Sequence, residues 1–215
     1  MESRWDGDCS LPNFIQATNR AGGKTVRCGS TFVLFALVAA SSAAYAQQTT
    51  LHLDPAKTTV KFTLGDVLHT VHGSFRLKRG TLQFDAAGGK LTGEIVVDAQ
   101  SGESGSKIRD GKMHREVLES EQYSEISFRP DRVTGTVNPG AKSAVRVHGI
   151  FSIHGVDREI EVPAEAEIAE DHWSATLHFT IPYVKWGMKN PSKLFLRVDD
   201  SVEIDVVAAG SLTRP

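Results

Sequence analysis

Cysteine is nearly absent from this sequence. Only Cys9 and Cys28 occur among 215 residues, and both lie before the part of the chain in which regular patterns begin. From residue 47 onward the chain therefore has no thiol nucleophile, no cysteine metal ligand and no disulfide of its own. This excludes a disulfide-stapled fold, a cysteine-based zinc site and a cysteine enzyme for that part.

An excess of charge of one sign is also lacking. The chain has 24 Lys and Arg residues against 26 Asp and Glu residues, a formal net charge of −2 at pH 7. The two signs are interspersed along the chain. We therefore expect neither nucleic acid nor an anionic membrane surface to be the main partner.

Long apolar runs are missing, apart from one short run at residues 31–40. It follows three basic residues between positions 20 and 27 and precedes Ala44-Tyr45-Ala46. A basic start, an apolar centre and an A-x-A end are typical of a secretory signal peptide, and a membrane-spanning helix needs roughly 20 apolar residues. We predict that residues 1–46, an N-terminal extension and signal peptide, are removed, and that residues 47–215 form one periplasmic domain without stable membrane insertion.

What is present beyond residue 46 is strict alternation of apolar and polar residues. Ile160, Val162 and Ala164, for example, alternate with Glu159 and Glu161. Such alternation is typical of strands with one solvent-exposed and one buried face, which are common in antiparallel sheets. The runs are separated by turn sequences at residues 86–89, 138–140, 155–157 and 170–171. Nine or ten runs predict an all-β fold, an antiparallel β-barrel of about eight strands, because closure removes exposed edges.

The alternation fails once, between residues 106 and 120. Ile108, Met113 and Val117 are spaced there roughly as on one face of a helix. We predict one short helix or ordered lid at this place, between two strands.

Histidine is the first candidate for catalysis or metal binding. His69 and His72 are three residues apart, which places them on opposite faces of a strand. His148 and His154 share a face but are separated by roughly 20 Å at about 3.3 Å per residue. Without a ligand spacing we predict no metal site and no cofactor.

Carboxylates and serines give equally weak catalytic signals. Pairs such as Glu203 and Asp205 could serve acid and base chemistry in a pocket, but they lie opposite apolar faces, which predicts a charged outer surface. Ser104 stands in a Gly/Ser stretch that lacks the strand-to-helix setting of a nucleophile elbow. We predict no catalytic residue and no enzyme.

The inferred interior face is rich in aromatic residues, namely Phe62, Phe75, Phe84, Phe128, Phe151, Trp173 and Phe179. It also carries small residues, namely Gly73, Gly93, Gly149, Ala164, Ala166 and Ala175. A packed core would use the same aromatics. We expect the small residues to leave space for one ligand, as an eight-stranded barrel can.

Short motifs in a fixed order now indicate a family. They are Leu53-Asp54-Pro55, Val60-Lys61-Phe62, Val71-His72-Gly73-Ser74-Phe75, Gly80-Thr81-Leu82-Gln83-Phe84-Asp85, Ile108-Arg109-Asp110-Gly111-Lys112-Met113, Tyr123-Ser124-Glu125-Ile126-Ser127-Phe128 and Val147-His148-Gly149-Ile150-Phe151-Ser152-Ile153-His154-Gly155-Val156. From about residue 51 to 210 the chain resembles the YceI family of lipocalin-like periplasmic proteins. The resemblance implies a barrel that binds polyisoprenoid or other amphiphilic lipids.

The resemblance departs from the family pattern at two places, residues 111–114 and residues 181–191. Both are expected to border the ligand entrance, where Trp186 and Phe195 would line the mouth. The ligand-binding residues that we predict are Phe62, Val71, Phe75, Phe84, Ile95, Ile108, Arg109, Met113, Phe128, Phe151, Trp173, Phe179 and Trp186.

The function expected from the sequence is binding of a polyisoprenoid, an isoprenoid quinone or a fatty-acid-like lipid inside the barrel. Two alternatives stay open. One is an enzyme that acts on a hydrophobic substrate through His114 or a carboxylate near the mouth. The other is a stress or scaffold protein with a filled interior. The sequence also leaves a homodimer open.

Overall fold

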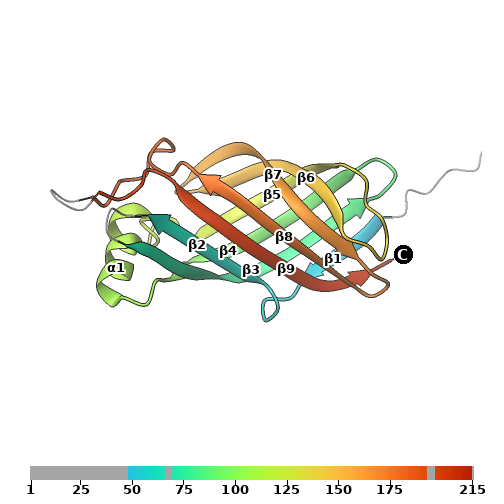
Figure 1. The fold of residues 1–215 in the computed structure, drawn as a ribbon, viewed down its shortest axis with the longest axis horizontal. Helices are drawn as coiled ribbons and strands as arrows, with labels where there is room; N and C mark the ends of the chain where they lie inside the picture. The colour runs from blue at the N-terminus through green and yellow to red at the C-terminus, as the bar shows by residue number, and fades with distance from the viewer. Residues whose placement is uncertain (1–47, 66–68, 193–196, 215) are drawn as a thin grey trace, which may run out of the picture. The chain divides into compact units, whose positions relative to one another are not determined.

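The computed structural model describes residues 48–65, 69–192 and 197–214, all within one compact unit (Figure 1). The predicted extension and signal peptide lie outside the described residues. The strands are β1 (Gln48–Leu53), β2 (Thr59–Gly65), β3 (Thr70–Asp85), β4 (Lys90–Glu103), β5 (Glu125–Thr134), β6 (Ser143–Ile153), β7 (Val156–Ile168), β8 (His172–Ile181) and β9 (Val202–Thr213). A short helix α1 (Lys107–Lys112) continues into the π-helical turn η1 (Met113–Val117) between β4 and β5.

The sheet closes on itself through antiparallel pairs. Neighbours from β2 through β9 follow the order β3-β2-β9-β8-β7-β6-β5-β4, and β4 pairs back with β3. Strands β1 and β2 share one position in this ring, because each pairs with both β3 and β9 at different points along them. The prediction of an antiparallel β-barrel of about eight strands with one short helix is therefore confirmed.

A turn that begins at Asp54 separates β1 from β2, the two strands that occupy one position in the ring. The Asp54 side chain accepts a hydrogen bond from the Ala56 backbone N–H (2.9 Å), and its carbonyl accepts one from the Thr58 N–H (2.9 Å). Asp followed by Pro favours such a turn, since the side chain bonds the backbone and proline donates nothing. The Thr58 hydroxyl then bonds the backbone of Ala209 on β9, so β2 resumes pairing in line with β1.

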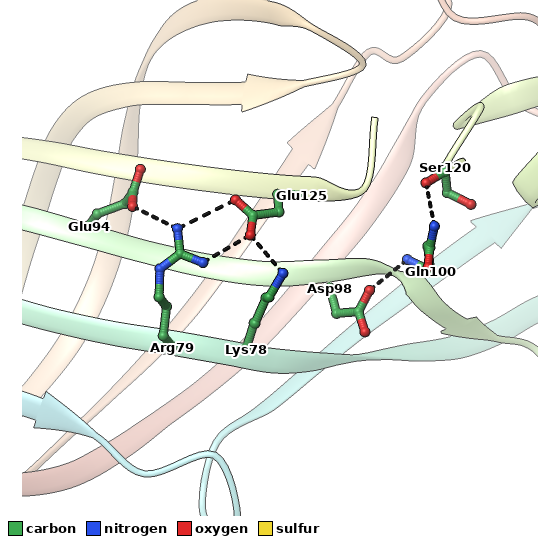
Figure 2. Close-up of polar contacts among 7 residues, drawn as sticks. All are labelled: Lys78, Arg79, Glu94, Asp98, Gln100, Ser120 and Glu125. Atoms are coloured by element: carbon green, nitrogen blue, oxygen red, sulfur yellow. Dashed lines mark hydrogen bonds and ion pairs between the residues drawn. The ribbon is translucent and has the colours of Figure 1, made fainter. Parts of the chain in front are cut away.

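A bulge in β3 reverses which side chains point inward. The register between β3 and β4 shifts between Leu77 and Arg79, which leaves Lys78 and Arg79 together on the outer face. Figure 2 shows both side chains reaching Glu125 on β5, at 2.8 and 2.9 Å. Before the bulge the inward residues have odd numbers, and after it, from Leu82 on, they have even numbers.

The barrel has two distinct ends. Figure 1 shows α1 at one end and the C-terminus at the other. Around the C-terminal end the buried side chains form one cluster, namely Leu51, Leu53, Leu77, Leu82, Phe84, Leu91, Trp173, Ala208 and Leu212. A second cluster belongs to the helical end, namely Leu118, Phe151, Ile153, Ile181, Tyr183 and Met188. We call these the filled end and the lid end.

No helix in residues 48–65, 69–192 and 197–214 combines the length and apolarity needed to cross a membrane.

Candidate functional site

A cavity of about 410 Å³ occupies the barrel interior toward the lid end. Its wall is built almost wholly from apolar side chains of the strands, and α1, η1 and the segment between β8 and β9 complete it. Along most strands the lining residues alternate, as Val60, Phe62 and Leu64 do on β2, because successive side chains point to opposite faces. Arg109 belongs to this wall and is also exposed to solvent, so the cavity reaches the surface at the lid.

Nine of the residues predicted from the sequence line this cavity. They are Phe62, Val71, Phe75, Ile95, Arg109, Met113, Phe128, Phe151 and Phe179. Two contacts between aromatic rings lie within the wall. The rings of Phe62 and Phe75 lie 5.4 Å apart, and those of Phe151 and Phe179 lie 6.3 Å apart in an edge-on arrangement. That these residues bind a ligand stays a prediction.

Phe84 and Trp173 point inward as predicted but belong to the filled end and do not line the cavity. Phe84 lies opposite Leu91, and Trp173 lies opposite Ile168 and Gly210. Both belong to one buried cluster with residues such as Leu82 and Leu91. Periodicity identifies the inward face of a strand, but it does not reveal how far along the barrel the interior is open.

Ile108 and Trp186 are the other two predicted residues outside the cavity wall. Ile108 is 87% exposed, on the outside of α1. The Trp186 ring packs against the Phe151 ring, with centroids 6.0 Å apart, but Trp186 itself does not line the cavity. A helix of six residues has only part of its surface against the barrel, and the sequence did not indicate which part. Phe195 lies outside the described residues.

The segment between β8 and β9 supplies wall residues that the sequence analysis missed, among them Tyr183, Met188 and Pro191. The departure from the family pattern at residues 181–191 pointed to this segment, but the alternation that identifies inward residues ends at Ile181. The Tyr183 hydroxyl donates a hydrogen bond to the Asp199 carbonyl (2.7 Å). Burial, and then the negative charges of Asp200 and Asp199, raise the pKa of Tyr183 to about 12.

The expectation that glycine and alanine create the open space is wrong. A side chain at Gly73 would overlap the Phe62 ring and the Glu103 carbonyl, and one at Gly93 would overlap the Thr81 carbonyl. Gly93 also has a φ of +120°, which only glycine adopts readily. These glycines permit close approach of backbone and ring, and none of the small residues proposed for this role lines the cavity.

Among the described residues, two polar contacts join the lid to the segment between β8 and β9. The Lys112 ammonium donates to the Pro191 carbonyl (2.5 Å), and Lys189 forms an ion pair with Glu116 (3.3 Å). The Lys189–Glu116 pair is an exposed ion pair of modest strength, whereas the Lys112 hydrogen bond is partly buried. The lid end thus combines an apolar cluster with these polar contacts, whereas the filled end is closed by apolar residues of the strands.

His114, the base considered for an enzyme, is fully engaged away from the cavity. Its Nε2 lies 2.9 Å from the Gly102 carbonyl, and its Nδ1 lies 3.0 Å from the Ser120 hydroxyl. A carbonyl only accepts, so Nε2 carries the proton and Nδ1 accepts from the hydroxyl. This arrangement fixes η1 to β4, and His114 is not among the residues that line the cavity.

The paired carboxylates lie on the outer face with cross-strand partners. Glu161 pairs with Arg146 (3.1 Å), and Asp205 accepts a hydrogen bond from His178 (2.7 Å). This hydrogen bond raises the pKa of His178. In the described part of the chain, no group of three or more His, Cys, Asp or Glu side chains is arranged to hold a metal ion.

Fold and cavity together define a closed eight-stranded antiparallel β-barrel with an apolar interior space. The family model of the YceI-like domain matches residues 51–209, so the chain belongs to the YceI-like domain family. Among curated proteins, none matches the chain.

Solved structures share this fold at low sequence identity. The crystal structure of Burkholderia cenocepacia BcnA has 17% identity and a TM-score of 0.61, with 74% of this chain and 99% of that chain covered. A polyisoprenoid binding domain from Saccharophagus degradans, implicated in plant cell wall breakdown, has 17% identity and a TM-score of 0.58 over 76% and 98%. The Campylobacter jejuni YceI protein has 15% identity and a TM-score of 0.53 over 67% and 86%.

Proposed function

We propose that this protein binds an amphiphilic molecule with a long apolar part, such as a polyisoprenoid, an isoprenoid quinone or a fatty-acid-like lipid, inside the barrel. The observation that carries the proposal is the apolar cavity of about 410 Å³ beneath the lid. Sites for small molecules typically have volumes of about 300–1,000 Å³ and mostly apolar walls. Burial of the apolar part would supply the driving force, at about 25 cal/mol per Å² removed from water before the costs of binding.

Further support comes from the binding described for a protein of the same fold. The Saccharophagus degradans domain is described as polyisoprenoid binding. The open volume also argues against a scaffold role with a filled interior, since a packed core leaves no such space. The engagement of both His114 nitrogens argues against an enzyme at the mouth. Binding without catalysis is therefore the role that we propose.

Export is the second part of the proposal. Basic residues, a short apolar run and Ala44-Tyr45-Ala46 support cleavage after Ala46 and delivery to the periplasm. N-terminal sequencing of the protein from a periplasmic extract should find Gln47 first. A chain that retains residues 1–46 and stays in the cytoplasm would contradict export.

The binding test uses two adjacent valines of β9. Val206 lines the cavity, whereas Val207 lies on the outside and is 44% exposed. Val206→Trp should fill part of the cavity, and Val207→Trp is its matched control. The protein is to be produced with its own signal, purified without detergent, and examined by native mass spectrometry and lipid extraction.

We expect a stoichiometric apolar adduct in the wild type and in Val207→Trp, and a reduced adduct in Val206→Trp. Equal adducts in both variants would place the ligand outside the cavity. A clean apo mass, unchanged after quinones, polyprenols and fatty acids are offered, would overturn the binding function.

A further inference from the structure

Two positive charges stand in the described part of the cavity wall, which is otherwise uncharged. Of the described residues that line the cavity, Arg109 and Lys112 are the charged ones, and none is acidic. Both lie on α1, three residues apart, and residues with this spacing are neighbours on a helix surface. Ser104, just before α1, lines the same part of the cavity.

Neutral oxygen atoms hold both cations. The Arg109 guanidinium donates to the Ser104 carbonyl (2.8 Å) and to the Ser104 hydroxyl (3.1 Å). The Lys112 ammonium donates to the Pro191 carbonyl (2.5 Å). Within the described residues neither cation forms an ion pair, so these contacts orient the two charges without neutralising them.

The carboxylates on the same helical segment are committed elsewhere. One oxygen of Asp110 accepts hydrogen bonds from the Ser104 backbone N–H (2.8 Å) and hydroxyl (2.6 Å). Glu116 pairs with Lys189. The local acidic groups thus stabilise the loop and the lid, and they leave the positive charge at the mouth available for a partner.

We propose that Arg109 and Lys112 form a site for an anionic headgroup, so that the ligand is an amphiphile with a carboxylate or a phosphate. The inference rests on the proposed function, since the apolar tail must lie in the cavity for its head to reach these residues. A guanidinium matches the two oxygens of a carboxylate or phosphate, and an ammonium adds a point charge. The adjacent apolar wall lowers the dielectric constant on one side of the cations, so the attraction is stronger there than in open water.

Matched pairs of amphiphiles test the headgroup separately from the tail. Dissociation constants are to be measured for a fatty acid and the fatty alcohol of equal chain length, and for a prenyl phosphate and its prenol. At low salt the anionic member should bind about tenfold tighter or more, which corresponds to about 1.4 kcal/mol. Raising the salt concentration should reduce this preference, because both cations lie near solvent.

Substitutions of the two cations test which residues produce the preference for anionic amphiphiles. Arg109→Gln with Lys112→Gln should bring the anionic and the neutral member to equal affinity. The charge-retaining pair Arg109→Lys with Lys112→Arg should keep most of the preference. Lys107→Gln and Arg115→Gln remove exposed cations of the same helical segment that do not line the cavity, and they should change the preference little.

The outcomes separate the two proposals. A preference for carboxylate or phosphate that disappears only with Arg109 and Lys112 supports the site and identifies the headgroup. Tight binding of charged and neutral members with equal affinity would overturn the anionic site but leave the binding function intact. Failure of all four amphiphiles to bind would overturn the binding function itself.

Discussion

The two ends of the barrel come from the same alternating sequence but differ in what they enclose. At the filled end, side chains such as Leu82, Phe84 and Trp173 meet across the interior and are 5–7% exposed. At the lid end, inward residues such as Phe75, Phe128 and Ile204 surround open volume. Aromatic residues occur at both ends, so aromatic content does not decide which end is hollow.

The way each end is closed accounts for the difference. The filled end is closed by strand residues, among them Leu51 and Leu212, which lie opposite each other on β1 and β9. The lid end is covered by α1, η1 and the segment between β8 and β9, which pack through apolar residues such as Leu118, Tyr183 and Met188 and are also joined by polar contacts. The proposed ligand would enter at this end, where opening separates a short helical segment from a loop and leaves the paired strands in place.

The largest effect is expected from removing a leucine side chain from the filled end and, for comparison, one from the cavity wall. Leu82→Ala should lower the free energy of unfolding by about 2–5 kcal/mol, since it leaves a cavity in a packed cluster. Leu177→Ala should cost about 2 kcal/mol or less, because Leu177 already faces open volume. Urea denaturation of both variants measures the difference, and equal losses would show that the cavity wall is packed as tightly as the filled end.

A smaller effect on the free energy of unfolding is expected at alkaline pH, and it comes from Tyr183 at the lid end. The pKa of Tyr183 is raised from 10.0 to about 12, so the folded protein keeps the phenol protonated where the unfolded chain would ionise it. This contribution to stability is fully present below pH 10 and is lost as the pH rises through about 12.

Denaturation midpoints between pH 9 and 12 should therefore fall less steeply in Tyr183→Phe than in the wild type. Tyr123→Phe, which keeps Tyr183, serves as the control. Identical slopes in the wild type and Tyr183→Phe would contradict the assignment.

The smallest effect on stability is expected from removing a charge on the outer face of the barrel. Hydrogen bonds from Arg79 and then Lys78 lower the pKa of Glu125 from 4.5 to about 2 (Figure 2). This contribution to stability is present above pH 4.5 and is lost as the pH falls through about 2. Glu125→Gln should cost less than about 1 kcal/mol at pH 7, because exposed ion pairs are screened by solvent.

High salt and low pH should both reduce the difference between Glu125→Gln and the wild type. Glu165→Gln, at a long exposed pair of 3.9 Å with Lys142, is the matched control and should have less effect. Thermal unfolding at pH 7 and pH 2, with and without added salt, measures both variants. A loss that persists unchanged at pH 2 would contradict an electrostatic origin.

The bulge in β3 shows how a pattern can be visible in the sequence and still be incompletely interpreted. The apolar residues change from odd positions, ending at Leu77, to even positions, beginning at Leu82. That change is the signature of one extra residue in a continuous strand. The structure joins the two runs in one strand of 16 residues.

Patterns within the sequence were enough to predict the all-β class, the approximate number of strands, the position of the short helix and nine residues of the cavity wall. These follow from local rules, because period-two alternation and turn residues act within a few positions of each other. The inward direction of Phe62 and Phe179, for example, follows from their neighbours alone.

Three features depend on packing between distant parts of the chain: where the interior is empty, which face of α1 covers it and which charges lie at the mouth. Phe84 and Phe75 have equivalent patterns in the sequence, but packing surrounds the first and leaves the second beside open volume. Ile108 and Lys112 stand on one short helix, yet the first faces solvent and the second the cavity. Open volume and unpaired charge depend on contacts between side chains of distant strands. Local sequence patterns carry no information about those contacts.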